Sequence, residues 1–363
     1  MREISLDILR GIFIFDMIFV DSPVDFSQSY KIFLHTAWEG ISIADLAFPG
    51  FVFTMGMASA YSTAKKSPTL QKIFRRTIIL FLLGILYNEL PAIFSLFLSA
   101  DYTKEIFYTQ AIEHIRIFGV LQRLALAYFL GLLIVKFLKS EKKIIFASLI
   151  LLIISSAGFH IYSPENPFDR ADNISLAVDL IFPGVNHIYV DYDPEGLYGT
   201  IATTSSMLFG FIVGKILMRG EIFLLLKFGV GFLIFGVLWN FLDITSKPLW
   251  TAPYVFFNAS FDTFLLVTIK FLCENFFVAE KIFHPIMALG MNPIIFYFLN
   301  LFGLCFLFLI KVGDLSIYKF IFEHSIKGFI SMPFSIALYS FVYCSLWFPL
   351  AEIFYRKKIF IKL

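Results

Sequence analysis

One histidine in this sequence has acidic residues on either side of it along the chain, and the group could perform proton or acyl transfer. Asp45 follows His35, and Asp21 precedes it. An imidazole that reaches two carboxylates can act as a general base or as an acyl acceptor, because one carboxylate fixes its tautomer and the other stabilises the imidazolium. The neighbouring Trp38 leaves a second interpretation open, in which His35 is an ordinary residue of a membrane interface.

Other polar residues stand inside long apolar stretches, where an ionisable group costs free energy unless it is paired, hydrated or directed into a cavity. Together with the histidine they could line a polar path through a membrane, as a reaction or a transport pathway requires. A structural interpretation is also open, because Asp7 and Arg10 have the spacing of an ion pair on one helical turn, and Arg123 could neutralise a nearby aspartate. The residues concerned are Asp7, Arg10, Asp16, Gln122, Arg123, Asp262 and Asn292.

The composition identifies the elements that must position these residues. Of 363 residues, 59% are hydrophobic and 15% are charged, whereas about a quarter of the residues in a soluble domain are charged. The apolar surplus must face lipid, which excludes a soluble protein and makes the bilayer the first expected partner. The net charge of +2 leaves no basic excess for nucleic acid.

Neither the cysteines nor the histidines have the spacing of metal ligands, so no metal is expected. The cysteines are interpreted as small apolar packing residues. They are Cys273, Cys305 and Cys344.

Apolar stretches long enough to cross a bilayer recur along the chain and predict an all-α polytopic membrane protein with about ten transmembrane helices. The ninth is expected to be interrupted at Gly290 and Pro293. The stretch 92–100 is a candidate for an additional interfacial or re-entrant piece. The predicted spans are 5–22, 42–64, 73–92, 115–137, 143–160, 197–217, 221–243, 252–274, 284–310 and 328–352. No internal repeat divides the chain, so residues 1–363 are predicted to form a single domain.

The distribution of positive charge sets the predicted orientation. Most of the 29 Lys and Arg residues fall in the termini and in alternate loops, and cytoplasmic loops carry such an excess. Both termini are therefore predicted to be cytoplasmic, and His35 external. The longest loop, 161–196, is then external as well, and its acidic character suits a surface that faces water.

Two features of the predicted external side have two interpretations each. The segment Asp193-Pro194-Glu195-Gly196 is typical of a turn ahead of the sixth span, but its acids could also bind a sugar amine. Trp38 and Trp250 are interpreted as aromatic residues of the membrane interface, with stacking against a sugar as the alternative.

Several short motifs follow one another from end to end of the chain. They are Ser5–Gly11, His35–Trp38 with Ala44–Pro49, Arg116–Arg123, Tyr192–Gly196 with Gly199-Thr200, Leu249-Trp250, Gly290–Asn292 and Tyr355–Phe360. In this order they resemble the motifs of the transmembrane acyltransferases typified by lysosomal heparan-α-glucosaminide N-acetyltransferase. Because the sequence has no counterpart of the luminal N-terminal domain of the lysosomal enzyme, we expect a bacterial relative in the cytoplasmic membrane.

The resemblance implies a reaction. Cytoplasmic acetyl-CoA would supply an acetyl group to an amine at the external face, carried by an amino sugar such as glucosamine, and a homodimer is also implied. The histidine of the family's His-x-x-Trp motif is catalytic, and here it is His35. The sequence departs from the family at three positions, because Asp21 stands where an asparagine is common, Glu39 replaces an amide and Asp16 replaces an aliphatic residue.

These inferences define a working set of site residues. His35 would deprotonate the amine or accept the acetyl group, with Asp45 and Asp21 orienting the imidazole. The residues expected to bind the acceptor or the thioester are Gln122, Arg123, Asn292, Glu39, Trp38, Asp193 and Glu195. The residues expected near the CoA phosphates are Arg10, Asp7, Arg356, Lys357 and Lys358, although the last three equally fit an ordinary cytoplasmic anchor.

A secondary transporter is the rival interpretation. The same buried acids, arginine and asparagine could form a path for a sugar or another small polar solute without covalent chemistry. The halves of the sequence show no inverted repeat, which counts against a transporter. The two interpretations also differ in CoA binding, which only the acyltransferase requires.

Overall fold

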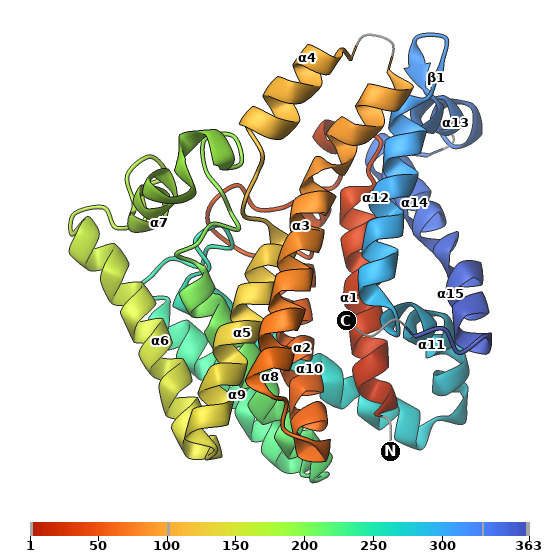
Figure 1. Ribbon diagram of the computed structural model, residues 1–363. Helices are drawn as coiled ribbons and strands as arrows, with labels where there is room; N and C mark the ends of the chain where they lie inside the picture. Colours follow the sequence, from red (N-terminus) through yellow and green to blue (C-terminus); the bar gives the residue numbers. More distant parts are fainter. Residues whose placement is uncertain (1–2, 100–101, 329, 361–363) are drawn as a thin grey trace.

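The computed structural model describes residues 3–99, 102–328 and 330–360, and these are almost entirely helical (Figure 1), which confirms the predicted all-α class. The α-helices are α1 (Ile4–Asp21), α2 (Ala47–Lys65), α3 (Leu70–Leu98), α4 (Lys104–Phe107), α5 (Val120–Leu138), α6 (Glu141–Tyr162), α7 (Ile174–Asp179), α8 (Thr200–Met218), α9 (Ile222–Trp239), α10 (Ala252–Asn275), α11 (Phe277–Gly290), α12 (Pro293–Leu309), α13 (Ile317–Ser325), α14 (Met332–Ser345) and α15 (Trp347–Arg356). Short helical turns are η1 (Phe26–Gln28), η2 (Lys31–Phe33), η3 (Tyr108–Glu113), η4 (Leu180–Gly184) and η5 (Val185–His187). One antiparallel hairpin pairs β1 (Lys311–Val312) with β2 (Leu315–Ser316).

Seven helices in the described part of the chain are long and apolar enough to cross a membrane, and there are eight such spans if one bent pair counts as one. The predicted number of about ten is therefore not confirmed. A helix lies within each of the predicted ranges, but α1 and α2 are not among those that qualify. The reason in α1 is its charge, since it carries Asp7, Arg10, Asp16 and Asp21.

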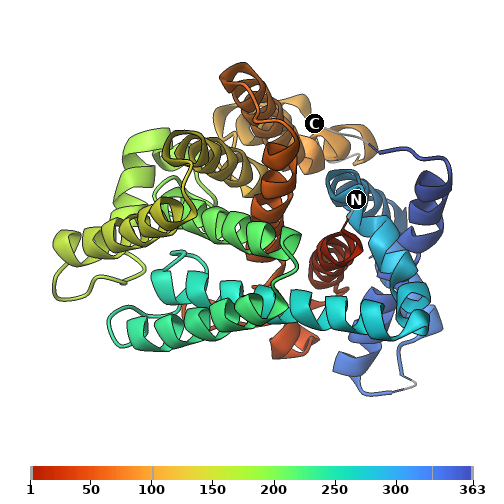
Figure 2. The same ribbon diagram turned by 90° about the horizontal axis from the view of Figure 1, so that it is seen from below.

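The charged helix α1 lies in the centre of the molecule, as Figure 2 shows in a view along the bundle. It packs against α2, α10, α11, α12 and α14, and Leu9, Ile14 and Ile18 on it are almost fully buried. An enclosed helix faces protein and cavities in place of lipid, so it can carry charges that a lipid-facing span would not tolerate. The charge of α1, which separates it from the seven apolar helices, is therefore compatible with its enclosed position in the bundle.

The predicted interruption of the ninth span is confirmed. Helices α11 and α12 meet at an angle of 81° across the break between Gly290 and Pro293. Two glycines, Gly11 on α1 and Gly290 at the end of α11, allow these helices to touch. A Cβ atom on Gly11 would collide with the backbone of Ile286, and one on Gly290 would collide with the backbone of Asp7. Small residues let membrane helices approach this closely.

Three predicted boundaries need correction. The second span begins at Ala47, five residues later than the predicted 42, so Asp45 lies in a loop and not in a helical turn. The fourth begins at Val120, because 115–119 is not helical. The stretch 92–98 is no separate re-entrant piece, since α3 continues to Leu98 through Pro91, while residue 100 lies outside the described residues.

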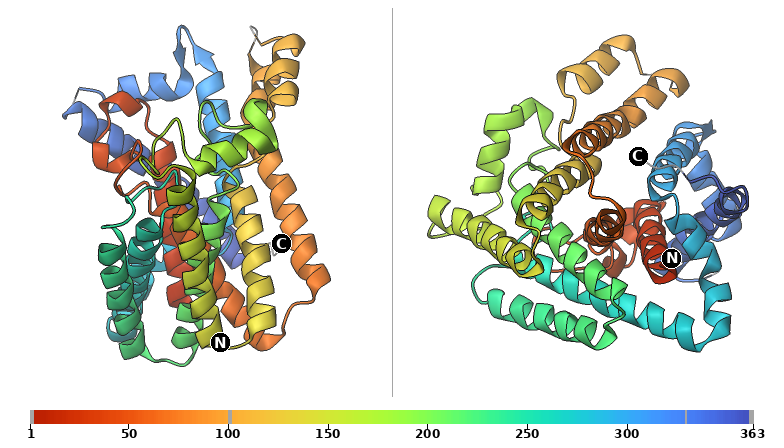
Figure 3. Two further views of the ribbon diagram at one scale, coloured as in Figure 1. Left: turned by 90° about the vertical axis from the view of Figure 1, so that its left-hand side faces the viewer. Right: turned by 60° about the horizontal axis from the view of Figure 1, so that its bottom comes forward.

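The extramembrane segments that carry the site gather at one end of the bundle. The chain between α1 and α2 and the chain between α6 and α8 both lie at the upper end in Figure 3, left. The start of α1 and the α2–α3, α5–α6 and α8–α9 turns lie at the opposite end (Figure 1). We call these the loop end and the N-terminal end.

Helices α2 and α8 form a close pair in which glycine backbones meet. A Cβ atom on Gly56 would strike the backbone of Met207 and Phe211, and one on Gly210 would strike that of Phe53. This contact fixes α2, which begins two residues after Asp45, against the largely buried helix α8.

We expect Gly56→Ala to destabilise the protein, because overpacking a tight core contact costs about 1–3 kcal/mol. Gly231→Ala on α9 is the matched control, since a Cβ atom there has open space around it, and alanine exceeds glycine in helix propensity by about 1 kcal/mol. Thermal unfolding in detergent should give a lowered Tm for the first variant and an unchanged or raised Tm for the second. Equal effects would contradict the close packing of α2 and α8.

Candidate functional site

The predicted pair of His35 and Asp45 is present at the loop end. The Nδ1 atom of His35 lies 2.8 Å from Oδ1 of Asp45. The Asp45 side chain is fully buried, whereas the His35 side chain is 47% exposed. An imidazole held through Nδ1 by a carboxylate has Nε2 available for proton transfer.

The second oxygen of Asp45 holds the surrounding loop together. It accepts hydrogen bonds from the backbone N–H and the hydroxyl of Thr36, at 3.2 and 2.9 Å, and from the backbone N–H and the hydroxyl of Ser42, at 3.0 and 2.9 Å. Burial alone would raise the pKa of Asp45, but the hydrogen bond with His35, the charge of Lys247 and the bond from Ser42 together lower it to about 2. Asp45 is therefore a stable carboxylate at neutral pH.

Lys247 completes this group and was not among the predicted site residues. Its Nζ atom lies 3.0 Å from Nδ1 and 3.3 Å from Nε2 of His35, and 3.8 Å from Oδ1 of Asp45. The sequence offered no local signal for it, because Lys247 is more than two hundred positions away and looks like any loop lysine. Only its place two residues before the Leu249-Trp250 motif marks it.

A tight loop fixes the position of Lys247. The backbone N–H of Trp250 donates to the carbonyl of Lys247 at 3.0 Å, and that of Thr251 to the carbonyl of Ser246 at 3.2 Å. Trp250 has φ +53°, a left-handed conformation that costs a non-glycine residue about 1–2 kcal/mol. Its ring is completely buried and packs against Phe48 and Tyr254. The interpretation of Trp250 as an interface aromatic is therefore wrong.

A cavity of about 340 Å³ opens beside the imidazole. Trp38 lines it, and its Nε1–H donates to the carbonyl of Phe168 at 2.8 Å while its ring packs edge-on against Tyr192. The charged residues of the wall are Lys247, Arg170 and Asp191, of which the last two form an ion pair at 3.3 Å. The imidazole of His35 thus borders an open cavity with aromatic and charged walls.

The acids predicted to bind an amine, Asp193 and Glu195, point elsewhere. Both are buried, and the guanidinium of Arg116 binds them, with Nε donating to Asp193 at 3.0 Å and the NH2 nitrogen donating to Glu195 at 2.7 Å. Burial alone would raise the pKa of Glu195, but the charge of Arg116, followed by those of Lys247 and Arg123, lowers it. These two acids are therefore part of a buried ion-pair network. The predicted position of this turn at the start of the sixth span also needs correction, because α8 starts only at Thr200.

The side chain of Arg123, predicted to bind the acceptor or the thioester, is bound instead by other parts of the protein. Its two terminal nitrogens donate to the carbonyls of Pro194 and Gly196 at 2.8 and 2.6 Å, and its guanidinium lies 5.3 Å from the centre of the Trp250 ring. Gln122 beside it is fully buried, and neither side-chain polar atom has a partner in the described structure. Arg123 therefore fastens the 193–197 turn to α5, and Gln122 keeps unused hydrogen-bonding capacity.

The remaining predicted residues of the loop end are not joined to the pair by hydrogen bonds. Asp21 ends α1, and the charges of His35 and Lys247 act on it, but we find no hydrogen bond between Asp21 and His35 among the described residues. Glu39 is exposed and does not line the cavity. Asn292 does not line the cavity either, and its side chain donates to the carbonyl of Ile359 at 2.9 Å.

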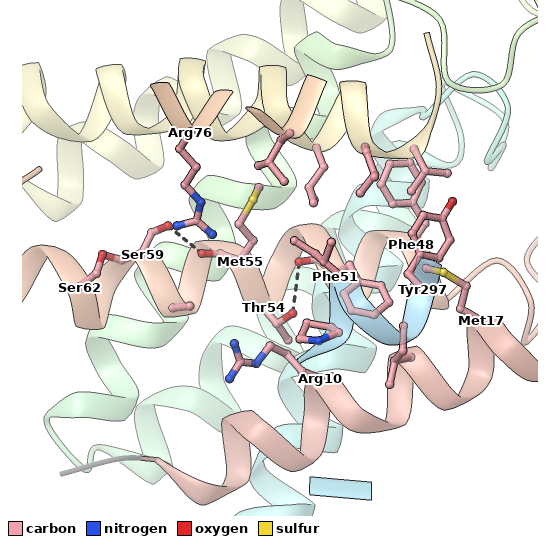
Figure 4. A pocket seen from close by; sticks show the side chains of 18 residues that line it. Arg10, Met17, Phe48, Phe51, Thr54, Met55, Ser59, Ser62, Arg76 and Tyr297 are labelled. Atoms are coloured by element: carbon pink, nitrogen blue, oxygen red, sulfur yellow. Dashed lines mark hydrogen bonds between the residues drawn. The ribbon is translucent and has the colours of Figure 1, made fainter. Parts of the chain in front are cut away.

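A second cavity, of about 380 Å³, lies beside α1 between α2, α3, α5 and α12. Figure 4 shows that Arg76 reaches into it near Ser59 and that Arg10 reaches into it from another helix, nearer Thr54. The other part of the cavity is mainly apolar and holds Phe48, Met17 and Tyr297. The Nε atoms of both arginines are buried without a hydrogen-bond partner in the described part of the chain. Arg76 is a second residue that the sequence analysis missed.

The other residues predicted for CoA lie outside this cavity. Asp7 pairs with Arg10, which confirms the predicted ion pair on one helical turn. Arg356 is 76% exposed and bonds to Glu352, and Lys357 and Lys358 are exposed as well. None of these three basic residues lines the cavity. In the described residues no three His, Cys, Asp or Glu side chains are grouped to hold a metal ion.

Comparison with known proteins identifies the family. The profile described as heparan-alpha-glucosaminide N-acetyltransferase, catalytic, matches residues 2–218, so the chain belongs to this family, as its motifs predict. It is 27% identical to the human heparan-alpha-glucosaminide N-acetyltransferase over 99% of the chain, and 24% identical to that of Mus musculus over 99% of the chain. The chain spans 59% and 60% of the length of these relatives. Family and apolar helices together indicate an integral membrane protein.

The buried carboxylate of Asp45 should make stability depend on pH. Its pKa in the fold, about 2, is below the unfolded value of about 3.9, so it contributes roughly 2–3 kcal/mol above pH 4 that is lost as the pH falls from 4 to 2. We expect the Tm difference between wild type and Asp45→Asn to be clearly larger at pH 5 than at pH 2.5 and to shrink as the pH falls below 4. A difference that stays constant down to pH 2.5 would contradict this assignment.

Proposed function

We propose that this protein is a membrane-embedded N-acetyltransferase that moves an acetyl group from acetyl-CoA at the N-terminal end to an amine at the loop end. The observation that carries the proposal is the pairing of a half-exposed His35 with the buried carboxylate of Asp45 beside an open cavity. The names of the family and of its relatives support the reaction type.

His35 is proposed to act through Nε2. In direct transfer the amine nitrogen attacks the thioester carbonyl, the C–S bond breaks as the C–N bond forms, and the amine proton moves to Nε2. The imidazolium then returns this proton to the departing thiolate, so that CoA leaves as a thiol. In the alternative, Nε2 attacks the thioester carbonyl, the C–S bond breaks and CoA leaves as the thiolate. The amine then attacks the acetyl group on Nε2, the C–Nε2 bond breaks as the C–N bond forms, and the amine proton passes to the thiolate or to water. Asp45 holds the opposite ring nitrogen in both routes.

The second cavity is the proposed site of acetyl-CoA. Arg10 and Arg76 with their unpartnered Nε atoms suit the phosphates, and the apolar part suits the narrow pantetheine arm. In that part, Met17 is one helical turn from Asp21 on α1, and Phe48 at the start of α2 is three residues after Asp45 in the chain. The thioester would therefore approach the imidazole from inside the bundle, and the acceptor from the loop end.

The acceptor is proposed to be an amino sugar. Trp38, Tyr189 and Tyr192 line the cavity beside His35, and aromatic rings are suitable surfaces for a sugar. Asp193 and Glu195, the acids that could attract a cationic amine, already form ion pairs with Arg116. They therefore do not support a cationic acceptor. The neutral form of the amine is the one that attacks a thioester.

The N-terminal end is proposed to face the cytoplasm of a bacterial cell. The turns between α2 and α3, α5 and α6, and α8 and α9 lie at this end (Figure 1), and Lys65, Lys66, Lys139 and Arg219 lie in or beside them. Such a concentration of basic residues is typical of the cytoplasmic side. A homodimer stays a prediction.

Replacing His35 by alanine should abolish acetyl transfer. With labelled acetyl-CoA and glucosamine, we expect purified His35→Ala to lose at least a hundredfold in rate, the usual contribution of a general base, while acetyl-CoA binding is kept. His114→Ala is the matched control, because His114 is an exposed loop residue outside both cavities. Undiminished transfer by His35→Ala would refute the proposed role, and a wild-type protein without CoA binding would favour a transporter.

Replacing Arg76 by methionine should weaken acetyl-CoA binding. A hydrogen bond to a charged group is worth about 1.5–3 kcal/mol, so we expect the KM for acetyl-CoA to rise about 10- to 100-fold with little change in kcat. Arg75→Met is the control, since the adjacent Arg75 is exposed and does not line the cavity. Similar KM values for both variants would place the phosphates elsewhere.

A further inference from the structure

A third cavity lies at the N-terminal end of the bundle. Its volume of about 690 Å³ exceeds those of the two cavities described above. It is formed where α2 and α5 end and where α3 and α6 begin, and α8 adds Phe211 and Lys215, which are one helical turn apart. It shares no lining residue with the cavity proposed for acetyl-CoA. It is therefore a separate site, and the proposed reaction makes no use of it.

The walls of this cavity are of two kinds. One part is apolar, and its side chains are buried in the protein. The other part is basic, and its three lysines come from α5, from the α5–α6 turn and from α8. A ligand that fits both parts has an apolar portion and a negatively charged group. The apolar residues are Ile73, Leu132, Val135, Ile144 and Phe211, and the basic residues are Lys136, Lys139 and Lys215.

The positive charges of the cavity are available for a ligand. Glu141 is the acid in its wall, and Arg219 binds it at 2.7 Å. Lys136 donates to a backbone carbonyl of the α2–α3 turn at 3.2 Å, which leaves its other N–H donors free. The side chains of Lys139 and Lys215 have no hydrogen-bond or ion-pair partner in the described part of the chain. The cavity therefore offers several donors with a net positive charge.

The cavity opens at the outer surface of the bundle. Phe137 lines it, and this residue is 72% exposed. It lies at the end of α5, which with the neighbouring α6 is among the helices long and apolar enough to cross a membrane. Phe146 and Ile153 on α6 are exposed as well. The basic wall thus lies at the end of apolar, outward-facing helices, the level at which lipid headgroups meet a membrane protein.

We propose that this cavity binds the phosphate group of an anionic phospholipid. Lys139 and Lys215 bind the phosphate through charge-assisted hydrogen bonds, and an acyl chain follows the apolar surface beside Phe137. A soluble phosphate compound would use the same lysines, but it would leave the apolar wall without a partner. The proposal does not depend on acetyl transfer, because the site is separate from both cavities assigned to that reaction.

The adjacent Lys142 and Lys143 provide a matched control. They lie in the first turn of α6 at the same end of the protein, but they are exposed and do not line the cavity. A general attraction between basic residues and anionic lipid would act on these two lysines as it acts on Lys139 and Lys215. A built site would depend on the second pair alone.

Native mass spectrometry of the purified protein, titrated with dioleoyl phosphatidylglycerol in detergent, measures the affinity for the first bound lipid. We expect the double variant Lys139→Gln with Lys215→Gln to weaken this affinity about tenfold or more. The control variant, Lys142→Gln with Lys143→Gln, should bind like wild type. Dioleoyl phosphatidylcholine, which has the same chains and a zwitterionic headgroup, should bind more weakly to wild type and should not distinguish the variants.

Three results would overturn the proposal. Equal weakening in both double variants would mean that lipid is attracted to the basic surface in general. Equal binding of the two lipids would leave an apolar groove without phosphate recognition. Displacement of phosphatidylglycerol by inorganic phosphate or glycerol 3-phosphate would assign the site to a soluble phosphate compound, whereas the proposal expects neither to compete. If the double variant does not fold, Lys215→Gln alone should weaken phosphatidylglycerol binding in the same direction, and unchanged binding would refute the site.

Discussion

The enclosure of one charged helix is the constraint on which the rest of this structure depends. Helix α1 carries Asp7, Arg10, Asp16 and Asp21 along its length, and lipid would make each of these charges costly. The surrounding helices therefore shield it, and the glycines Gly11 and Gly290 let α11 approach its backbone. One consequence is that polar side chains and a cavity lie beside this central helix, inside the bundle.

Charge compensation organises the loop end in a similar way. Several acids gather there, and each cation serves a different subset of them. Arg116 takes Asp193 and Glu195 into a buried network that holds the loop, while Asp45 is shared between His35 and Lys247. Because the structural acids are already neutralised, the open cavity keeps a small and distinct set of charges around the imidazole.

Close-packed backbones give this site its rigidity. The loop that carries Asp45 leads directly into α2, which glycine contacts fix against buried α8, and the hydroxyl of Tyr254 on α10 donates to the Asp45 carbonyl at 2.6 Å. Trp250, whose backbone is left-handed, packs against Phe48 of α2 and Tyr254 of α10. The proposed role of His35 would benefit from such support, because reaction rates fall steeply when a general base is displaced.

Local patterns in the sequence were enough to predict the helical class, the break at Gly290 and Pro293, the ion pair of Asp7 and Arg10 and, with the family motifs, the partnership of His35 and Asp45. These depend on residue types and on spacing within a few turns of chain, since apolar length, proline and the helical repeat act locally. Only the tertiary structure decided that Lys247 meets His35, that Arg116 binds the acids expected at the substrate, that Trp250 is buried, and that Arg76 but not Arg75 lines the inner cavity. Those contacts join distant segments, and their geometry follows from how whole helices pack and rotate against one another, which the residue pattern of any one segment does not contain.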